Sequence, residues 1–194
     1  PGQFAMLRPA NWGATDLVWA RPFSIYRADA DVVRFLVAVV GRGTARLAEL
    51  APGDPVTLWG PLGTFFARET EQPTLLLGGG IGVAPFAAYI DSHPRPDLLR
   101  LVFGHTLPLD AYPWPNLAGG VAAEEFYERG REDLARFIAL LTERIGELPA
   151  AGLVLACGPL PMLKTVKDLA AKAGVRCQLS LENRMACGVG ACLG

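Results

Sequence analysis

The stretch Thr74-Leu-Leu-Leu-Gly-Gly-Gly-Ile-Gly-Val-Ala-Pro85 restricts the fold of this chain more than any other feature. Its apolar run is typical of a strand buried on both faces, which occurs almost only in parallel sheets covered by helices. The glycines that follow let a backbone loop approach a phosphate, and Pro85 suits the first turn of a helix. Val83 stands where the strict G-x-G-x-x-G fingerprint has its last glycine. The stretch therefore predicts a parallel α/β sheet with a nucleotide-binding turn of a different class.

The second part of the chain repeats this unit of an apolar strand followed by a helical segment. Further strands are expected at Leu99 to Phe103, Leu153 to Ala156 and Arg176 to Ser180. Between the second and third strands, helical spacing and mixed charge predict a helix from Glu124 to Ile145, and we assign no chemistry to residues 107–149.

The first part of the chain has short apolar runs separated by turn residues, which predicts a small antiparallel barrel. These runs are Phe4 to Leu7, Asp16 to Tyr26, Val32 to Val40 and Val56 to Trp59. We expect two domains joined near residue 70, the barrel over residues 1–70 and the α/β domain over residues 71–180. A third segment begins at residue 181, and both ends of the chain look cut.

Composition excludes several classes of protein. The 18 basic and 19 acidic residues give a net charge of -1 without a basic block, which argues against nucleic acid as a partner. The longest uncharged stretches are shorter than the roughly 20 residues of a spanning helix and contain glycine and proline, so no membrane span is expected. Four cysteines are too few for a disulfide scaffold, which favours a soluble protein of the reducing cytoplasm.

The run Arg21-Pro22-Phe23-Ser24 places a permanent cation, a flat ring and a hydroxyl along one strand. Pro22 indicates an edge position, because proline cannot donate to a central ladder. Such a strand suits a flat ligand that carries phosphate. An ordinary edge strand with a solvated arginine explains the run equally well when it is taken alone.

A second glycine turn, Gly41-Arg42-Gly43-Thr44, follows an apolar run and precedes a short helix that Thr44 is expected to cap. The free N–H groups at such a helix start can bind a pyrophosphate. A plain glycine turn is the alternative. Two features of this kind about twenty residues apart are harder to attribute to chance.

Cysteines define two further candidate sites. Cys157-Gly158-Pro159 ends a parallel strand, where ligands of open α/β sheets bind, although a buried structural cysteine is the alternative. Cys187 and Cys192 stand five positions apart among glycines, which matches the first interval of the plant-type [2Fe–2S] run C-x4-C-x2-C. Two free cysteines in a loop are the commoner explanation for a lone C-x4-C. The third ligand would fall just past Gly194, so we expect this chain to hold no stable cluster.

Taken in order, these motifs resemble the ferredoxin-reductase family over nearly the whole chain. The tail S-L-E-N-R-M-A-C-G-V-G-A-C-L-G is most similar to the electron-transfer subunits of two-component, NAD-dependent dihydroorotate dehydrogenases. The resemblance implies a barrel that binds FAD, an α/β domain that binds NAD(H), and the start of a [2Fe–2S] segment over residues 181–194.

The resemblance also implies a role for each motif. One set would contact FAD, with Arg21 at the phosphates and Ser24 near the reactive ring nitrogen. The FAD set is Arg21, Pro22, Phe23, Ser24, Leu36, Val37, Ala38, Gly43 and Thr44. The set for the nicotinamide nucleotide is Gly79, Gly80, Gly82, Cys157, Gly158, Pro159 and Met162, and the metal set is Cys187 and Cys192.

Two departures from the family pattern carry expectations of their own. Val37 and Ala38 stand where the family commonly has an aromatic and a basic residue, which predicts weaker FAD binding. The familiar glycine loop after the third strand of the second half is missing. No arginine follows Leu99 to Phe103 until Arg129. A nearby arginine that could bind the 2′-phosphate of NADPH is therefore missing, which favours NADH over NADPH.

These assignments predict electron transfer from NADH through FAD to a [2Fe–2S] cluster and a partner flavoprotein, dihydroorotate dehydrogenase, in a hetero-oligomer. No Ser/His/Asp arrangement is needed for this chemistry, and His93 and His105 are expected to have surface or capping roles. One alternative is a flavin subunit of a hydrogenase or of an NADH-dependent ferredoxin:NADP reductase. Another is a docking domain that has lost its cofactors.

Overall fold

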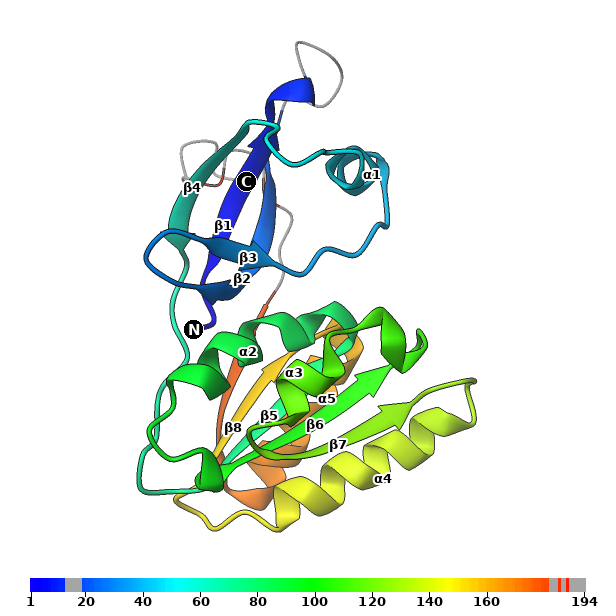
Figure 1. Ribbon diagram of the computed structural model, residues 1–194. Coiled ribbons are helices and arrows are strands. Elements are labelled where there is room, and N and C mark those ends of the chain that lie inside the picture. Colours follow the sequence, from blue (N-terminus) through cyan, green and yellow to red (C-terminus); the bar gives the residue numbers. More distant parts are fainter. Residues whose placement is uncertain (13–18, 182–184, 186–187, 189–194) are drawn as a thin grey trace.

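The computed structural model describes residues 1–12, 19–181, 185 and 188, and two sheets organise them (Figure 1). The first half contains β1 (Phe4–Pro9), β2 (Arg21–Ala28), β3 (Val33–Phe35), α1 (Arg42–Ala48) and β4 (Val56–Leu62). The second half contains β5 (Thr74–Gly79), α2 (Ala84–Ser92), β6 (Leu99–His105), α3 (Trp114–Ala118), β7 (Ala122–Tyr127), α4 (Asp133–Gly146), β8 (Leu153–Cys157), α5 (Leu160–Ala173) and β9 (Arg176–Ser180).

The first sheet is antiparallel, with the strand order β3-β2-β1-β4. Phe4 of β1 lies opposite Ser24 of β2, and Met6 lies opposite Pro22. Because side chains alternate between the faces of a strand, Ser24 shares one face with Phe4 and Met6, whereas Arg21 and Phe23 share the other. The predicted antiparallel half is confirmed, but the expected strand from Val32 to Val40 is shortened to β3.

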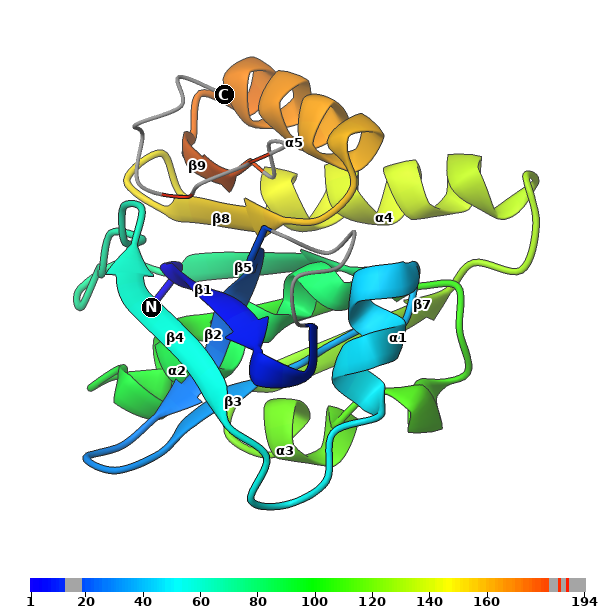
Figure 2. The same ribbon diagram turned by 90° about the horizontal axis from the view of Figure 1, so that it is seen from above.

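The second sheet is wholly parallel, with the order β7-β6-β5-β8-β9. All six residues of β5 are buried, as its continuous apolar run predicts. Helices α2 and α3 cover one face of the sheet, and α4 and α5 cover the other (Figures 1 and 2). The predicted α/β fold is confirmed.

One predicted helix begins nine residues too early. Residues Ala122 to Tyr127 form β7 at the edge of the sheet, and α4 starts only at Asp133. The acidic residues of β7 are accommodated because each has a partner. Glu124 accepts two hydrogen bonds from Arg144 of α4, at 2.5 and 3.2 Å, and Glu125 lies 2.7 Å from Nε2 of His105.

The two halves pack against each other. Tyr26 of β2 is buried in the same apolar cluster as Phe86 and Tyr89 of α2. The Tyr89 hydroxyl donates to the carbonyl of Ala67 over 2.9 Å, and Phe66 stacks on Phe86 with the ring centroids 5.7 Å apart. None of the helices formed by the described residues has the length and apolar character needed to cross a lipid bilayer.

Candidate functional site

The order of the second sheet reverses between β5 and β8, which places a crevice beyond the carboxyl ends of these two strands. The glycine loop of β5 and the Cys157-Gly158-Pro159 turn of β8 meet there. A Cβ atom on Gly82 would overlap the carbonyl oxygen of Cys157 and lie 2.7 Å from Cα of Gly158. The sequence must have glycine here because the two loops approach each other through their backbones.

Met162 and Pro159 complete this contact. A Cβ atom on Gly79 would lie 2.6 Å from Sδ of Met162 and 2.7 Å from Cδ of Pro159. Gly80 has a φ of 53°, a conformation that side chains rarely adopt. All seven residues that the sequence assigns to the nicotinamide nucleotide therefore lie in one place, although they come from two segments about eighty residues apart.

A cavity of about 370 Å³ opens beside this crevice, between α4 and α5. Gly79 and Gly80 lie at one side and Glu128, which directly follows β7, also lines it. Apolar side chains of the two helices form much of the remaining wall: Leu134, Phe137, Ile138, Leu141 and Met162. Such a cavity, mostly apolar with one carboxylate, suits a ligand that has a flat apolar ring and hydroxyl groups.

His105, which lines this cavity, belongs to a stack of rings that the sequence does not indicate. His105 lies between Phe103 and Tyr127, with centroids 4.9 and 5.2 Å away. Its Nδ1 donates to the carbonyl of Leu107 over 2.6 Å, and its Nε2 lies 2.7 Å from the Glu125 carboxylate. His105 is 3% exposed, so of the two expected roles it has the capping role and not the surface role, and it fixes the end of β6 against β7. His93 has a capping role as well, because its Nε2 lies 2.7 Å from the carbonyl oxygen of Glu69.

The sequence predicts no arginine close to the end of β6, but the structure places Arg129 at that edge of the sheet. Because β7 pairs with β6 in parallel, the residues after β7 lie at the same edge of the sheet. The Arg129 guanidinium lies 5.1 Å from the centroid of the Tyr127 ring. The preference for NADH therefore needs a different basis from the one that the sequence suggested.

In the first half, Arg21 and the turn before α1 come together. A Cβ atom on Gly43 would lie 3.2 Å from Nε of Arg21 and 3.6 Å from the Trp12 ring. The guanidinium of Arg21 lies 5.6 Å from the Trp12 centroid and donates to the carbonyl of Trp19 over 2.7 Å. The two predicted flavin motifs, twenty residues apart in sequence, are thus adjacent, and the missing side chain of Gly43 keeps them close.

The hydroxyl of Thr44 closes the turn before α1. It accepts hydrogen bonds from the N–H groups of Val40 and Gly41, at 2.9 and 3.1 Å, and donates to the carbonyl of Gly41 over 3.0 Å. Gly41 caps α1, and Thr44, the expected cap, is the third residue of the helix. Thr44 therefore shapes the turn, and its hydroxyl already has three partners inside it.

The remaining residues of the flavin set lie nearby. Phe23 meets Phe35 of β3 edge to face, with centroids 6.4 Å apart. Leu36 packs against the apolar cluster that contains Tyr26 and α2, so it also contributes to the contact between the halves. Val37 and Ala38 are half-buried and follow β3 as non-regular backbone.

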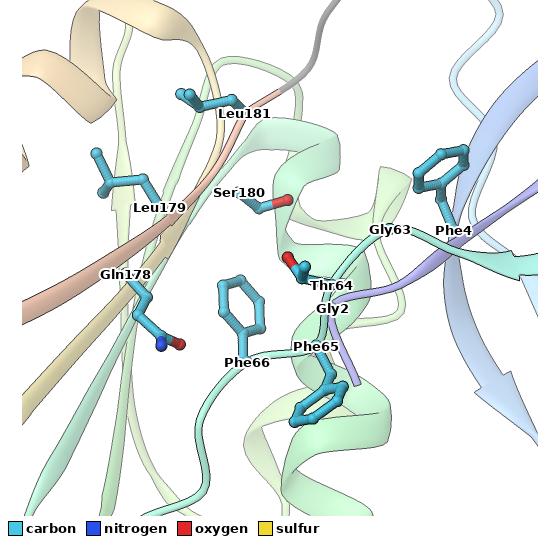
Figure 3. A pocket seen from close by; sticks show the side chains of 10 residues that line it. All are labelled: Gly2, Phe4, Gly63, Thr64, Phe65, Phe66, Gln178, Leu179, Ser180 and Leu181. Atoms are coloured by element: carbon cyan, nitrogen blue, oxygen red, sulfur yellow. The ribbon is translucent and has the colours of Figure 1, made fainter. Parts of the chain in front are cut away.

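A larger cavity, about 610 Å³, separates the first half from the end of β9 (Figure 3). The Thr64 and Ser180 side chains point toward each other across it, and Phe4, Phe65 and Phe66 supply aromatic walls (Figure 3). Phe4, which lines the cavity, lies opposite Ser24 in the β1–β2 ladder, but no residue of the Arg21-to-Ser24 segment lines the cavity itself. No local pattern in the sequence predicts this cavity, because its walls come from three distant segments.

Both described cysteines have restricted access to solvent. Burial raises the pKa of Cys177 to about 11, and Cys157 is buried at the end of β8. Cys187 and Cys192, the predicted metal ligands, lie outside the described residues. Within residues 1–12, 19–181, 185 and 188, no group of three or more His, Cys, Asp or Glu side chains is placed to hold a metal ion.

Curated proteins of known name are similar to the chain over its whole length. The electron transfer subunit of dihydroorotate dehydrogenase B (NAD(+)) from Caldanaerobacter subterraneus subsp. tengcongensis is 36% identical and covers 100% of this chain, which matches 75% of that protein. The subunit of the same name from Listeria monocytogenes is 34% identical, with 99% and 75% covered, and a homologue from Aquifex aeolicus is 34% identical, with 100% and 75% covered. No family model matches the chain.

Solved structures show the same fold. An NADH-dependent reduced ferredoxin-NADP oxidoreductase superposes with a TM-score of 0.75 at 23% identity, covering 99% of this chain and 70% of that one. Phthalate dioxygenase reductase superposes with a TM-score of 0.66 at 18% identity, covering 92% and 57%. The two sheets of this chain therefore have the ferredoxin-reductase-like arrangement.

Proposed function

Because the chain belongs to the family of electron transfer subunits of NAD-dependent dihydroorotate dehydrogenase, we propose that it passes electrons between NADH, a bound FAD and a catalytic partner subunit. The observation that carries this proposal is the pair of preformed loop contacts, one between Arg21 and Gly43 and one between Gly82 and Cys157. Each brings together two motifs that the sequence assigned to the same cofactor.

FAD fits the first contact. Arg21 supplies a permanent charge for a phosphate, and Gly43 leaves room beside it because a Cβ atom there would crowd the guanidinium. Phe23, on the same face of β2 as Arg21, presents a flat ring, and Ser24 offers a hydroxyl on the opposite face. Residues 1–70 would form the flavin half, with Pro22 and the segment Leu36 to Ala38 beside the cofactor.

NADH fits the second contact. Gly80, at the carboxyl end of β5, is the partly exposed glycine where a pyrophosphate can approach backbone without meeting a side chain, whereas Gly79 and Gly82 are buried and let the two loops pack closely behind it. Cys157 and Met162 would lie beside the nicotinamide, and residues 71–180 would form the nucleotide half. Glu128 lines the adjoining cavity, where a carboxylate accepts a hydrogen bond from a ribose hydroxyl and repels a 2′-phosphate, which favours NADH over NADPH.

The separate roles of NADH, FAD and the iron–sulfur cluster follow from the number of electrons that each transfers. NADH gives up a hydride, whereas an iron–sulfur cluster accepts single electrons, and FAD supplies the conversion from two-electron to one-electron chemistry when it is bound. The residues of this chain orient the two cofactors and exclude water. We propose that Cys187 and Cys192 begin a [2Fe–2S] segment after β9, that the partner oxidises dihydroorotate in pyrimidine biosynthesis, and that the complex is cytoplasmic.

The test is the flavin content of the purified full-length protein. We expect a yellow protein that releases FAD on denaturation, and an Arg21→Met variant that loses most of it. Arg34→Met is the matched control, because Arg34 lies on the neighbouring strand and pairs with Asp29 at 2.7 Å, away from the Gly43 turn. A colourless wild-type protein would favour the docking-domain alternative, and full flavin in Arg21→Met would contradict the assignment of Arg21.

Capture of the bound partner tests the proposal that the partner is a dihydroorotate dehydrogenase. The full-length protein, tagged and purified with its bound partner, should bring down a flavoprotein that oxidises dihydroorotate. A hydrogenase subunit in its place would overturn the partner while sparing the flavin assignment.

A further inference from the structure

Arg27, near the end of β2, reaches from the first half to the second. Its Nε donates to Oδ2 of Asp91 over 2.5 Å, and its Nη2 donates to Oδ1 of the same carboxylate over 3.1 Å. Asp91 lies in the last turn of α2. The contact is therefore a two-pronged ion pair between the two halves, and its planar geometry fixes an orientation as well as a distance.

Two further hydrogen bonds hold the same guanidinium. Nη2 also donates to the carbonyl of Asn116 in α3 over 3.0 Å, and Nη1 donates to the hydroxyl of Tyr26 over 3.2 Å. The guanidinium lies 5.0 Å from the Tyr26 centroid, and Tyr26 is itself buried in the apolar cluster of the second half. Arg27 is thus bound to α2, α3 and a buried ring at the same time.

Both elements that meet at Arg27 lead directly to a proposed cofactor site. Ser24 stands three residues before Arg27 on the same strand, about 10 Å away at the usual strand rise. At the other end, α2 begins at Ala84, immediately after the glycine loop, and Asp91 lies seven residues further, about 10 Å along the helix. A strand and a helix are stiff, so the ion pair joins the two sites by a short and rigid path.

We infer that Arg27 is a positioning residue that sets the distance and angle between the flavin and the nicotinamide; the inference rests on the proposed function. Hydride transfer needs the reacting atoms about 3–3.5 Å apart and aligned, and a small misplacement costs rate rather than binding. Arg27 lies outside the set of residues assigned to either cofactor, so its loss leaves each half-site intact and changes only how the halves face each other.

The test compares Arg27→Met with Arg95→Met in the full-length protein. Arg95 makes a two-pronged pair with Asp97, at 2.9 and 2.6 Å, but both residues belong to the second half. Methionine keeps much of the apolar stem in each variant. Partly exposed ion pairs contribute little to stability, so both variants should fold.

Four measurements separate positioning from a structural defect. Flavin content and the Kd for NAD+ should match the wild type within twofold in both variants. The rate of flavin bleaching by NADH, in anaerobic stopped flow at saturating NADH, should fall roughly tenfold or more in Arg27→Met alone. In flavin-free protein, amide hydrogen exchange of β2 and α2 should accelerate in Arg27→Met and remain at the wild-type rate in Arg95→Met.

Equal bleaching rates in the two variants would overturn the inference while leaving the proposed function intact. Unchanged hydrogen exchange in Arg27→Met would overturn it too, because the halves would then keep their orientation without the ion pair. A wild-type protein that binds no flavin is a separate result that refutes the proposed function, and in that case the exchange measurement alone decides whether Arg27 orients the halves.

Discussion

Replacement of Gly82 by alanine should damage stability and nucleotide binding together. The new Cβ atom would lie 2.6 Å from the carbonyl carbon of Cys157 and 2.7 Å from Cα of Gly158. Carbon atoms pack at about 3.5–4.0 Å, so the two loops must separate by roughly 1 Å. Both neighbours are backbone atoms of a turn fixed by the β5–β8 ladder, and they have no rotamer with which to move away.

The expected cost is that of overpacking a close-packed interior, about 1–3 kcal/mol. Part of it is offset by about 0.4–1 kcal/mol, because alanine restricts the unfolded chain more than glycine does. A net loss of about 1–2 kcal/mol corresponds to a Tm lower by roughly 2–8 °C in a chain of this size. The affinity for NADH should fall about tenfold or more, since the loop that receives the nucleotide is displaced.

Gly146→Ala is the matched control. Gly146 is the last residue of α4, and a Cβ atom there would meet nothing within 4 Å. The control should be neutral or more stable by up to about 1 kcal/mol, with unchanged NADH binding. Urea unfolding measures the stability, and calorimetric titration with NAD+ measures the affinity of the nucleotide site. If Gly82→Ala unfolds and binds like the wild type, the backbone contact that underlies the nucleotide site does not exist.

Three further predictions concern single side chains. Thr44→Val should lower the free energy of unfolding by about 1 kcal/mol and weaken FAD binding, because the turn at Gly41 loses its hydrogen bonds; unchanged urea midpoints and flavin content would contradict this. Cys177 should react with iodoacetamide at pH 8 roughly a hundredfold more slowly than free cysteine, because burial raises the pKa of its thiol to about 11. Mass spectrometry of the labelled peptide measures this rate, and a rate close to that of free cysteine would contradict the prediction. Hydrogen bonds, first among them the one from the backbone N–H of Arg129, lower the pKa of Asp133 in the folded protein. The ionised carboxylate therefore stabilises the fold at pH values above its unfolded pKa of about 3.9. This stabilisation is lost as the pH falls through the lower pKa of the folded state. The stability difference between the wild type and Asp133→Asn should therefore shrink on acidification from pH 5 to pH 2.5, and a constant difference would refute the assignment.

The strongest local patterns predicted the fold well. The continuous apolar run at Thr74 specifies a strand buried on both faces, and the glycines after it specify a turn that side chains cannot enter, so both were readable without tertiary information. The segment Arg176 to Ser180 was predicted with the bounds that β9 has. These elements have local causes.

The errors have non-local causes. Strand β7 contains Glu124 and Glu125, which disfavour a strand when considered alone, and only Arg144 and His105, distant in sequence, make them acceptable. The burial of His105 has the same origin, because it depends on β7 lying beside β6. The shortened strand β3 reflects Leu36, which packs against the second half instead of continuing the ladder.

Among the residues of the candidate sites, some are predictable from local motifs and others depend on contacts between distant segments. Local motifs selected Gly82 and Cys157, and the structure explains why they must meet. Glu128 and the cavities had no local signal, since their walls are assembled from distant segments. Arg27 had none either, because a single arginine on a strand shows nothing of what it reaches.

Anaerobic titration of the flavin-loaded protein with NADH tests the central claim most directly. The absorbance of the bound FAD near 450 nm should be bleached by one equivalent of NADH, while NADPH at the same concentration should react much more slowly, because Glu128 lines the cavity. A flavin that stays oxidised in excess NADH would contradict the account of this chain as the site where the nicotinamide nucleotide and FAD meet.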